Sequence, residues 1–329
     1  GSVQAAVSDG AGGWYIGGTF TEVGGVPRNR LAHILTDGSV DPVWNPNASN
    51  TVNALAVLGT TVYIGGDFFG ANAINGTLTR NRLAAVDATT GIATAWDPNA
   101  SNSVNALAVS GTTVYIAGSF VGANAINGSQ ARNHLAAVDA STGIATPWNP
   151  AASGAVTTMA VSGSTVYIGG TFNGANAING TLTRNRLAAV DATTGVATAW
   201  DPNANSTVNS LAVLGTTVYI GGAFNGANAI NGTLTRNRLA AVDATTGIAT
   251  AWDPNANSIV TRLAILGSTV YFSGSFTGAT AINGSVARNN LAAVDATTGI
   301  ATGWNPIAGG TVFALAASGS TVYVGGTFN

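Results

Sequence analysis

The arginines are the residues of this sequence whose type and regular spacing come closest to a chemical function. One Arg-Asn pair recurs in six successive repeats, and its arginine never varies: Arg28, Arg80, Arg132, Arg184, Arg236 and Arg288. A guanidinium is a planar fork that matches carboxylates and phosphates, so this set predicts repeated binding of anions or carboxylate sugars. The alternative is that each arginine holds a loop by bonding carbonyl groups or a nearby Asp. We favour it, because a residue present in every repeat usually serves what every repeat needs.

Aspartate recurs with the same spacing. We expect the recurring acids to lie at strand ends, immediately before turns whose backbone N–H groups they accept: Asp87, Asp139, Asp191, Asp243 and Asp295. Leu35 takes that place in the first repeat. Asp9, Asp41 and Asp67 fall outside the pattern, and we interpret them as acids that solvate turns or loops.

Five asparagines begin Asn-Gly-(Thr/Ser) sequences: Asn75, Asn127, Asn179, Asn231 and Asn283. Asn-Gly favours turns that need positive φ, whereas Asn-x-(Ser/Thr) is also the acceptor sequence for N-linked glycans. We interpret these residues as turns first and as glycan acceptors second.

The sequence offers no set of residues suited to catalysis or metal binding. His33 and His134 are the only histidines and occupy different positions in their repeats, Glu22 is the only Glu, and there is no Cys. Paired carboxylates for glycoside hydrolysis would have to come from scattered Asp residues, and no Gly-x-Ser-x-Gly sequence is present. We therefore expect no catalytic residue, no metal site and no cofactor. Calcium binding stays open, because loop oxygens are abundant although no EF-hand spacing occurs.

Charge is scarce. The chain carries 11 cations, all Arg, and 13 anions, for a net charge of −2, and charged residues make up 7% of the sequence; ordinary domains have roughly a quarter. No cluster of cations could follow a phosphate backbone, so we expect no nucleic-acid partner. No apolar run approaches the roughly 18 residues that a membrane helix needs, so we expect no membrane insertion.

The 329 residues are organised as repeats of 52 residues, the first being 48 residues long. Tyrosines and tryptophans mark the period: Tyr63, Tyr115, Tyr167, Tyr219, Tyr271, Tyr323, and Trp44, Trp96, Trp148, Trp200, Trp252, Trp304. The short first interval coincides with a shorter loop after Phe20, and loops tolerate such changes. We expect these large aromatic residues to pack between repeats rather than to serve as sugar-stacking platforms, because they gain most from burial.

Each repeat has the sequence pattern of four short strands. In the second repeat, we expect these strands at residues 52–57, 61–65, 82–87 and 92–96. A tight turn at Gly59 joins the first two strands, and a long loop containing Asn72 and Asn75 follows. Pro98 ends the fourth strand, because proline cannot donate to a ladder. Apolar residues alternate or form runs of four to six between Gly, Asn and Pro, which indicates strands and not helices.

Four strands per repeat at this period predict an all-β fold, a β-propeller, rather than a β-helix. We expect a single domain over 1–329 with the first strand of each repeat innermost. Seven first-and-second-strand hairpins occur but only six outer pairs, so the prediction is seven blades with an incomplete last one; six blades with an extra hairpin is the alternative. The sequence reaches Asn329 in mid-repeat, so we expect flanking chain or a partner to supply the outer hairpin that the last blade lacks, beside the last hairpin, 312–328.

The pattern VYIGG(T/D)F … RNRLAAVDATTG … W(D/N)P resembles the delta-60 (DUF5122-type) β-propeller repeats of large secreted bacterial proteins. The first repeat, with Asp37-Gly38-Ser39 before Trp44-Asn45-Pro46, is similar to the ending of that repeat. The later Asp-Ala-Thr-Thr-Gly turn is similar to quinoprotein-like propeller repeats. The resemblance implies an extracellular or cell-surface location and carries no catalytic residues to this chain.

The near identity of the repeats argues against an enzyme, because acid–base catalysis needs unlike environments that separate two pKa values. We therefore expect a non-catalytic structural or adhesive module of a filament, sheath or cell surface, with protein partners or self-assembly. The alternative is a multivalent carbohydrate or peptide binder that uses the long loops, such as 69–81, and gains affinity by avidity. A third hypothesis is a hydrolase or lyase that uses Asp side chains.

Overall fold

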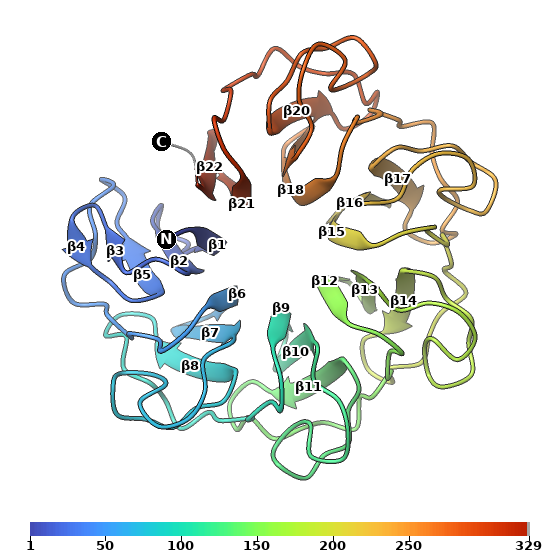
Figure 1. Ribbon diagram of the computed structural model, residues 1–329. Coiled ribbons are helices and arrows are strands. Elements are labelled where there is room, and N and C mark those ends of the chain that lie inside the picture. The colour runs from blue at the N-terminus through green and yellow to red at the C-terminus, as the bar shows by residue number, and fades with distance from the viewer. Residues whose placement is uncertain (328–329) are drawn as a thin grey trace. The chain divides into compact units, whose positions relative to one another are not determined.

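The computed structural model describes residues 1–327, and every regular element in that part of the chain is a β-strand (Figure 1). The expectation of an all-β chain is confirmed. No helix of the described residues is long and apolar enough to cross a membrane. The predicted last hairpin, 312–328, extends beyond the described residues at Phe328.

A first strand opens each of the seven repeats, and its starting residue agrees with the sequence pattern in every case. We number the repeats from these strands: β1 (Val3–Ser8), β6 (Val52–Leu58), β9 (Val104–Ser110), β12 (Val156–Ser162), β15 (Val208–Leu214), β18 (Val260–Leu266) and β21 (Val312–Ser318).

A second strand follows each first strand and lies in the middle of its sheet. These strands are β2 (Trp14–Gly18), β7 (Thr61–Gly66), β10 (Thr113–Gly118), β13 (Thr165–Gly170), β16 (Thr217–Gly222), β19 (Thr269–Gly274) and β22 (Thr321–Gly326). In six repeats a third strand pairs with the second strand, on the side opposite the first strand. These third strands are β5 (Leu31–Ile34), β8 (Leu83–Asp87), β11 (Leu135–Asp139), β14 (Leu187–Asp191), β17 (Leu239–Asp243) and β20 (Leu291–Asp295). All pairs are antiparallel, and each sheet keeps the order first, second, third.

The predicted tight turn is confirmed. Leu58 pairs with Thr61 across the two residues between them, and Gly59 has the positive φ of 57° that this turn requires. Asn72 and Asn75 also adopt positive φ, at 63° and 54°, as their sequence predicted. Repeat one differs in its shorter loop, where β3 (Glu22–Val23) and β4 (Val26–Pro27) form a small hairpin.

The prediction of a fourth strand is wrong, because the repeats form three-stranded sheets. In repeat two the segment 92–96 contributes only an isolated bridge between Ala93 and Val86. The Ile92 carbonyl and the Thr94 N–H still bond the third strand, at Asp87 and Ala85. The ladder stops there because the next donor, the Trp96 N–H, is accepted by the Thr94 hydroxyl at 3.2 Å. A local hydrogen bond of Thr thus replaces strand pairing.

The third strand also begins one residue later than predicted, at Leu83 instead of Arg82. Arg82 has a φ of 66°, outside the extended region. The same left-handed conformation recurs at this position in other repeats, where the residue is Arg30, His134, Arg186, Arg238 or Asn290. This residue therefore turns the chain out of the loop and into the strand.

The chain divides into two compact units, Gly1–Ala151 and Ala152–Asn329. In the first unit, β1 lies beside β6 and β6 beside β9; in the second, β12, β15, β18 and β21 follow one another in the same way. First strands of consecutive repeats are therefore neighbours within each unit, as the prediction of inner strands requires.

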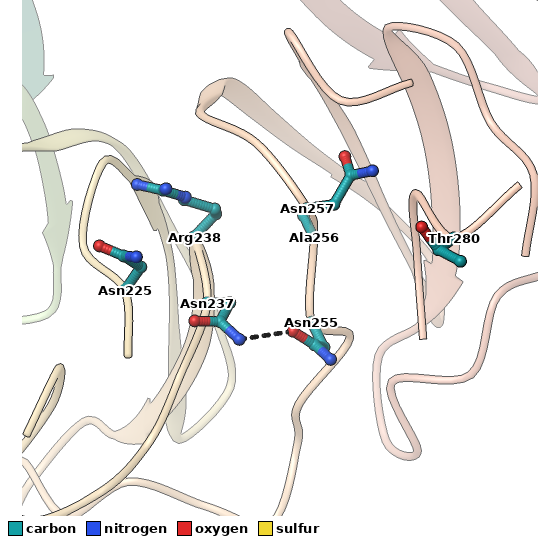
Figure 2. A pocket seen from close by; sticks show the side chains of 7 residues that line it. All are labelled: Asn225, Asn237, Arg238, Asn255, Ala256, Asn257 and Thr280. Atoms are coloured by element: carbon teal, nitrogen blue, oxygen red, sulfur yellow. Dashed lines mark hydrogen bonds between the residues drawn. The ribbon is translucent and has the colours of Figure 1, made fainter. Parts of the chain in front are cut away.

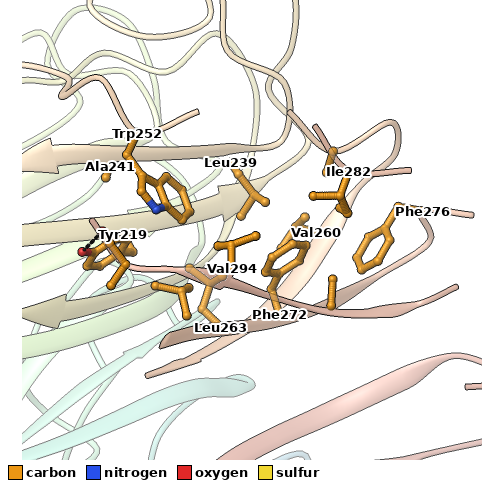
Figure 3. Packing of buried hydrophobic residues seen from close by; sticks show 14 of the residues in the cluster. Tyr219, Leu239, Ala241, Trp252, Val260, Leu263, Phe272, Phe276, Ile282 and Val294 are labelled. Atoms are coloured by element: carbon orange, nitrogen blue, oxygen red, sulfur yellow. Dashed lines mark hydrogen bonds between the residues drawn. The ribbon is translucent and has the colours of Figure 1, made fainter. Parts of the chain in front are cut away.

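The hydrophobic core lies between consecutive sheets, not within a single one. The cluster shown in Figure 3 joins two repeats of the second unit. Repeat five contributes Tyr219, Leu239 and Trp252, and repeat six contributes Val260, Leu263, Phe272, Phe276, Ile282 and Val294. Equivalent clusters join repeats one and two, two and three, and four and five. Each repeat therefore needs a neighbour to bury its apolar face.

Two adjacent glycines of the second strand should differ in their tolerance of alanine. A Cβ at Gly222 would meet the Thr207 carbonyl oxygen at 2.3 Å, whereas a Cβ at Gly221 would meet the side chains of Val260 and Leu263. Backbone cannot give way as a side chain can, so Gly222→Ala should lose about 1–3 kcal/mol of unfolding free energy. Gly221→Ala should lose less, because Ser273 occupies the same position in repeat six. Urea unfolding of the two variants tests this, and equal losses would contradict it.

Candidate functional site

The recurring arginines direct their guanidinium groups at main-chain carbonyls of their own repeats. Arg80 Nη1 donates to the Thr79 carbonyl at 2.8 Å, and Nη2 donates to the Thr94 carbonyl at 2.7 Å. Arg28, Arg132, Arg184, Arg236 and Arg288 each make the corresponding pair of bonds. The Nε atoms of all six are buried. These groups join the end of the long loop to the segment after the third strand.

Three of these arginines also lie close to an Asp of the Trp-Asp-Pro element. Arg80 is 3.6 Å from Asp97, and the Arg184–Asp201 and Arg236–Asp253 distances are 3.6 and 3.7 Å. Burial raises the pKa of each of these Asp residues, and the nearby guanidinium lowers it only in part. The ion pairs are partly exposed and of the kind that contributes little to stability.

The sequon asparagines are also engaged by the backbone. Asn231 Nδ2 donates to the Gly247 carbonyl at 2.9 Å and to the Pro202 carbonyl at 3.4 Å, while Oδ1 accepts the Ala249 N–H at 2.8 Å. Asn75, Asn127, Asn179 and Asn283 make the same bonds to the glycine carbonyl and to the alanine N–H. The nitrogen that would carry a glycan is thus the atom that holds two segments together.

Tyrosine and tryptophan side chains cross from one repeat to the next. The Tyr63 hydroxyl donates to the Ala140 carbonyl at 2.8 Å, and Trp96 Nε1 donates to the Asp139 carbonyl at 3.0 Å. The two rings meet edge to face with centroids 5.1 Å apart, and both are buried. These contacts confirm that the aromatic residues pack between repeats and do not form open stacking platforms.

The recurring Asp residues organise turns, as predicted. Asp87 Oδ1 accepts the N–H groups of Thr89 and Thr90 and the Thr90 hydroxyl. Such bonds favour the ionised carboxylate. In repeat three, hydrogen bonds from the Ser141 hydroxyl and from Thr142 lower the pKa of Asp139 to about 2.

Repeat one contains a buried charged cluster that the sequence pattern did not reveal. His33 Nδ1 lies 2.9 Å from Asp41 Oδ2, and His33 Nε2 lies 3.2 Å from Asp9 Oδ2. The His33 side chain is 10% exposed, and its ring stacks on Tyr15. Burial alone would raise the pKa of Asp41, but hydrogen bonds from His33, Val43 and Trp44 outweigh it and lower that pKa. Asp9 and Asp41 therefore hold His33 and are not merely solvating acids; a His in place of the usual strand Ala was the available signal.

Asp67 likewise has partners that its interpretation as a loop acid did not foresee. Its carboxylate accepts hydrogen bonds from Asn53 and from the Ser103 hydroxyl, which joins repeat two to the residue before β9. His134 takes the place of the strand-entry arginine, with Nδ1 3.1 Å from the Gly118 carbonyl oxygen. Burial lowers the pKa of His134. Within residues 1–327, no group of three His, Asp or Glu side chains is arranged to hold a metal ion.

The second unit contains a polar pocket of about 310 Å³, formed where repeats five and six meet (Figure 2). Its lining residues are Asn225, Asn237, Arg238, Asn255, Ala256, Asn257 and Thr280. None belongs to the arginine or asparagine sets that the sequence singled out. The arrangement offers amide donors and acceptors, one guanidinium and one hydroxyl.

Comparisons with known proteins concern the fold alone. No protein-family model and no curated protein match the chain. The chain is similar to the crystal structure of the computationally designed Ika8 protein, with 17% identity and a TM-score of 0.59, over 98% of this chain and 80% of that one. The designed Ika4 protein matches 55% of this chain and 91% of its own, at 18% identity and a TM-score of 0.37, which is too low to support an argument.

Replacing a sequon asparagine should cost stability even without any glycan. Asn231→Asp removes the two Nδ2 donations and places a carboxylate against two carbonyl oxygens, so it should lose about 1–3 kcal/mol of unfolding free energy. The control is Asn228→Asp, because Asn228 is exposed and has a similar φ of 62°. Denaturant unfolding should separate the two variants; equal stability would show that the Asn231 bonds contribute nothing.

The His33 cluster predicts a specific dependence on pH. The folded-state pKa of Asp41 lies below the ordinary value of 3.8, so its ionised form stabilises the fold above that pH. Wild type should be more stable than Asp41→Asn at neutral pH, and this difference should shrink as the pH falls through the lowered pKa. Unfolding free energies measured at a series of pH values test it.

Asp97→Asn provides the opposite case as a control. The pKa of Asp97 is raised, so the wild type should lose stability relative to this variant as the pH rises through that pKa. If both differences changed with pH in the same direction, the proposed role of the His33 cluster would be wrong.

Proposed function

We propose that this protein is a non-catalytic structural module of an extracellular or cell-surface assembly. In this proposal the repeats are the blades of a seven-bladed β-propeller related to the delta-60 repeats. The sheet order and the adjacent first strands within each unit support blades. The scarcity of charge and the abundance of small and amide residues support an extracellular protein whose solubility does not depend on net charge.

One observation carries the proposal: the polar side chains that recur in the repeats are used to hold the repeats themselves. Arg80 and its counterparts bond carbonyl oxygens, the sequon asparagines bridge segments, and Asp87 and its counterparts accept turn N–H groups. A catalytic or multivalent binding surface built from these residues would need Nη atoms, amides and carboxylates that are already bonded, or arginine Nε atoms that are buried. The carbohydrate alternative based on the repeated arginines therefore has less support.

A recurring exposed aliphatic residue supports self-assembly. The residue after each Asp-Ala-(Thr/Ser)-Thr-Gly turn is Ile or Val. The side chains at this position are largely exposed: Ile92 64%, Ile144 66%, Val196 60%, Ile248 63% and Ile300 65%. The backbone around Ile92 is held by bonds to Thr90 and Asp87, so the side chain is presented rigidly. A preorganised apolar group loses little entropy when a partner buries it. We assign this role to a second copy of the chain.

Replacing these residues should abolish assembly and leave the fold intact. A variant with Thr at positions 92, 144, 196, 248 and 300 keeps the β-branched shape but removes apolar surface from each exposed position. We expect sedimentation velocity to show concentration-dependent oligomers for wild type and monomers for the variant, with unchanged thermal unfolding.

A control variant with Ala in place of the exposed Thr89, Thr193, Thr245 and Thr297 alters the same turns without removing the aliphatic groups. It should assemble like wild type. A wild-type protein that stays monomeric at all concentrations, with only isolated particles in negative-stain images, would overturn the proposal.

A further inference from the structure

The pocket between repeats five and six contains hydrogen-bonding groups that the fold does not use. Within the described chain, the side-chain amide of Asn225 and the hydroxyl of Thr280 make no hydrogen bond, and neither do Asn255 Nδ2 and Asn257 Oδ1. Arg238 donates through Nη1 to the Ala223 carbonyl, which leaves its other nitrogens available. In the recurring arginine and asparagine sets, by contrast, the guanidinium Nη atoms and the side-chain amides are bonded, and the arginine Nε atoms are buried without a partner among the described residues.

Asn255, Asn257 and Arg238 are held in place by the bonds that they do make. Asn237 Oδ1 accepts the Gly226 N–H at 2.8 Å, and Asn237 Nδ2 donates to Asn255 Oδ1 at 2.7 Å. Asn257 Nδ2 donates to the Thr277 carbonyl at 2.9 Å. Figure 2 shows Asn225 and Arg238 on one side of the pocket, Thr280 on the other, and Asn255 and Asn257 between them. The free groups of Asn255, Asn257 and Arg238 are therefore preorganised, which lowers the entropic cost of binding.

The chemistry of the lining specifies the class of ligand. Amides and a hydroxyl both donate and accept, so they match a ligand with several hydroxyl groups. Arg238 is the one charged residue of the lining, and no carboxylate opposes it. A guanidinium prefers a planar carboxylate. The pocket volume of about 310 Å³ lies at the lower end of the range for small-molecule sites, which suits one sugar ring.

We propose that this pocket binds a uronic acid residue of an acidic saccharide, with Arg238 on the carboxylate and the asparagines on the ring hydroxyls. This inference goes beyond the structural role proposed above and uses none of the residues on which that role depends. It places saccharide recognition at side chains that are free.

The residue set recurs one repeat earlier in the same unit, which supports a second, related site; there, unlike in the pocket, the Oδ1 of the last asparagine, Asn205, accepts the Asn225 N–H at 3.3 Å. Repeats four and five supply the counterparts of the lining residues: Asn173, Asn185, Arg186, Asn203, Asn205 and Asn228. Asn185 Nδ2 donates to Asn203 Oδ1 at 2.8 Å, as in the pocket. Repeat two differs at two of these positions, with Phe69 in place of Asn225 and Ser101 in place of Asn257. We therefore place acidic saccharide binding in the second unit, with two sites whose affinities combine on a polymer.

Titration of the whole protein with D-galacturonic acid, D-galactose and acetate, followed by NMR, tests the proposal. Wild type should bind galacturonate more tightly than galactose or acetate. The Arg186→Asn/Arg238→Asn variant should lose roughly tenfold or more in galacturonate affinity, because a charge-assisted bond is removed. It should keep its affinity for galactose. Asn290 occupies this position in repeat six with a φ of 61°, so the backbone accepts Asn.

A second variant, Asn205→Ser/Asn257→Ser, introduces the serine found at Ser101 and should weaken both sugars. Arg82→Asn is the matched control, because Phe69 and Ser101 replace two of the amides around Arg82, and it should change neither affinity. Absence of saturable galacturonate binding, acetate binding as tight as galacturonate, or an equal loss in Arg82→Asn would each overturn the proposal.

Discussion

The structure depends on hydrogen bonds that side chains of one repeat donate to main-chain carbonyl oxygens of the next repeat. In the second unit, the Tyr219 hydroxyl bonds the Ala296 carbonyl at 2.7 Å, and Trp252 Nε1 bonds the Asp295 carbonyl at 3.0 Å. The same two rings bury their apolar surface against the neighbouring sheet. Hydrophobic burial supplies the driving force, and the directional bonds fix how one repeat sits on the next. Both need identical spacing in every repeat, which explains why Tyr and Trp recur so regularly.

This arrangement limits where function can reside. Arginine, asparagine and aspartate at the recurring positions satisfy loop carbonyls and turn N–H groups that would otherwise be buried without partners. Among the groups of residues 1–327 that remain for other molecules are aliphatic side chains outside the sheets, such as Ile248, and the amides around Arg238. The first kind suits assembly, and the second suits a small polar ligand.

Repeat one shows how a departure from the common pattern is accommodated. It has a shorter loop, a His in the third strand and acids at positions where the other repeats have none. His33 bonds both Asp9 and Asp41. The unusual histidine and the two unusual acids therefore compensate one another within a single cluster. A buried charge is tolerated when it is paired and hydrogen-bonded. Asp41 also receives the N–H groups of Val43 and Trp44, which places the tryptophan correctly.

The sequence alone determined the period, the all-β class, the starts of the first strands and the turn residues, because these follow from local preferences such as alternating apolar residues and positive φ at Gly59. It did not determine the fate of the segment 92–96, where the Thr94 hydroxyl takes the Trp96 N–H, or the joining of Asp9, His33 and Asp41. It also did not reveal the pocket at Arg238. The charged cluster and the pocket bring together residues distant along the chain. Only the tertiary structure decides which of their donors and acceptors meet, because that choice depends on how loops and strands fold together within a repeat and on how neighbouring repeats pack.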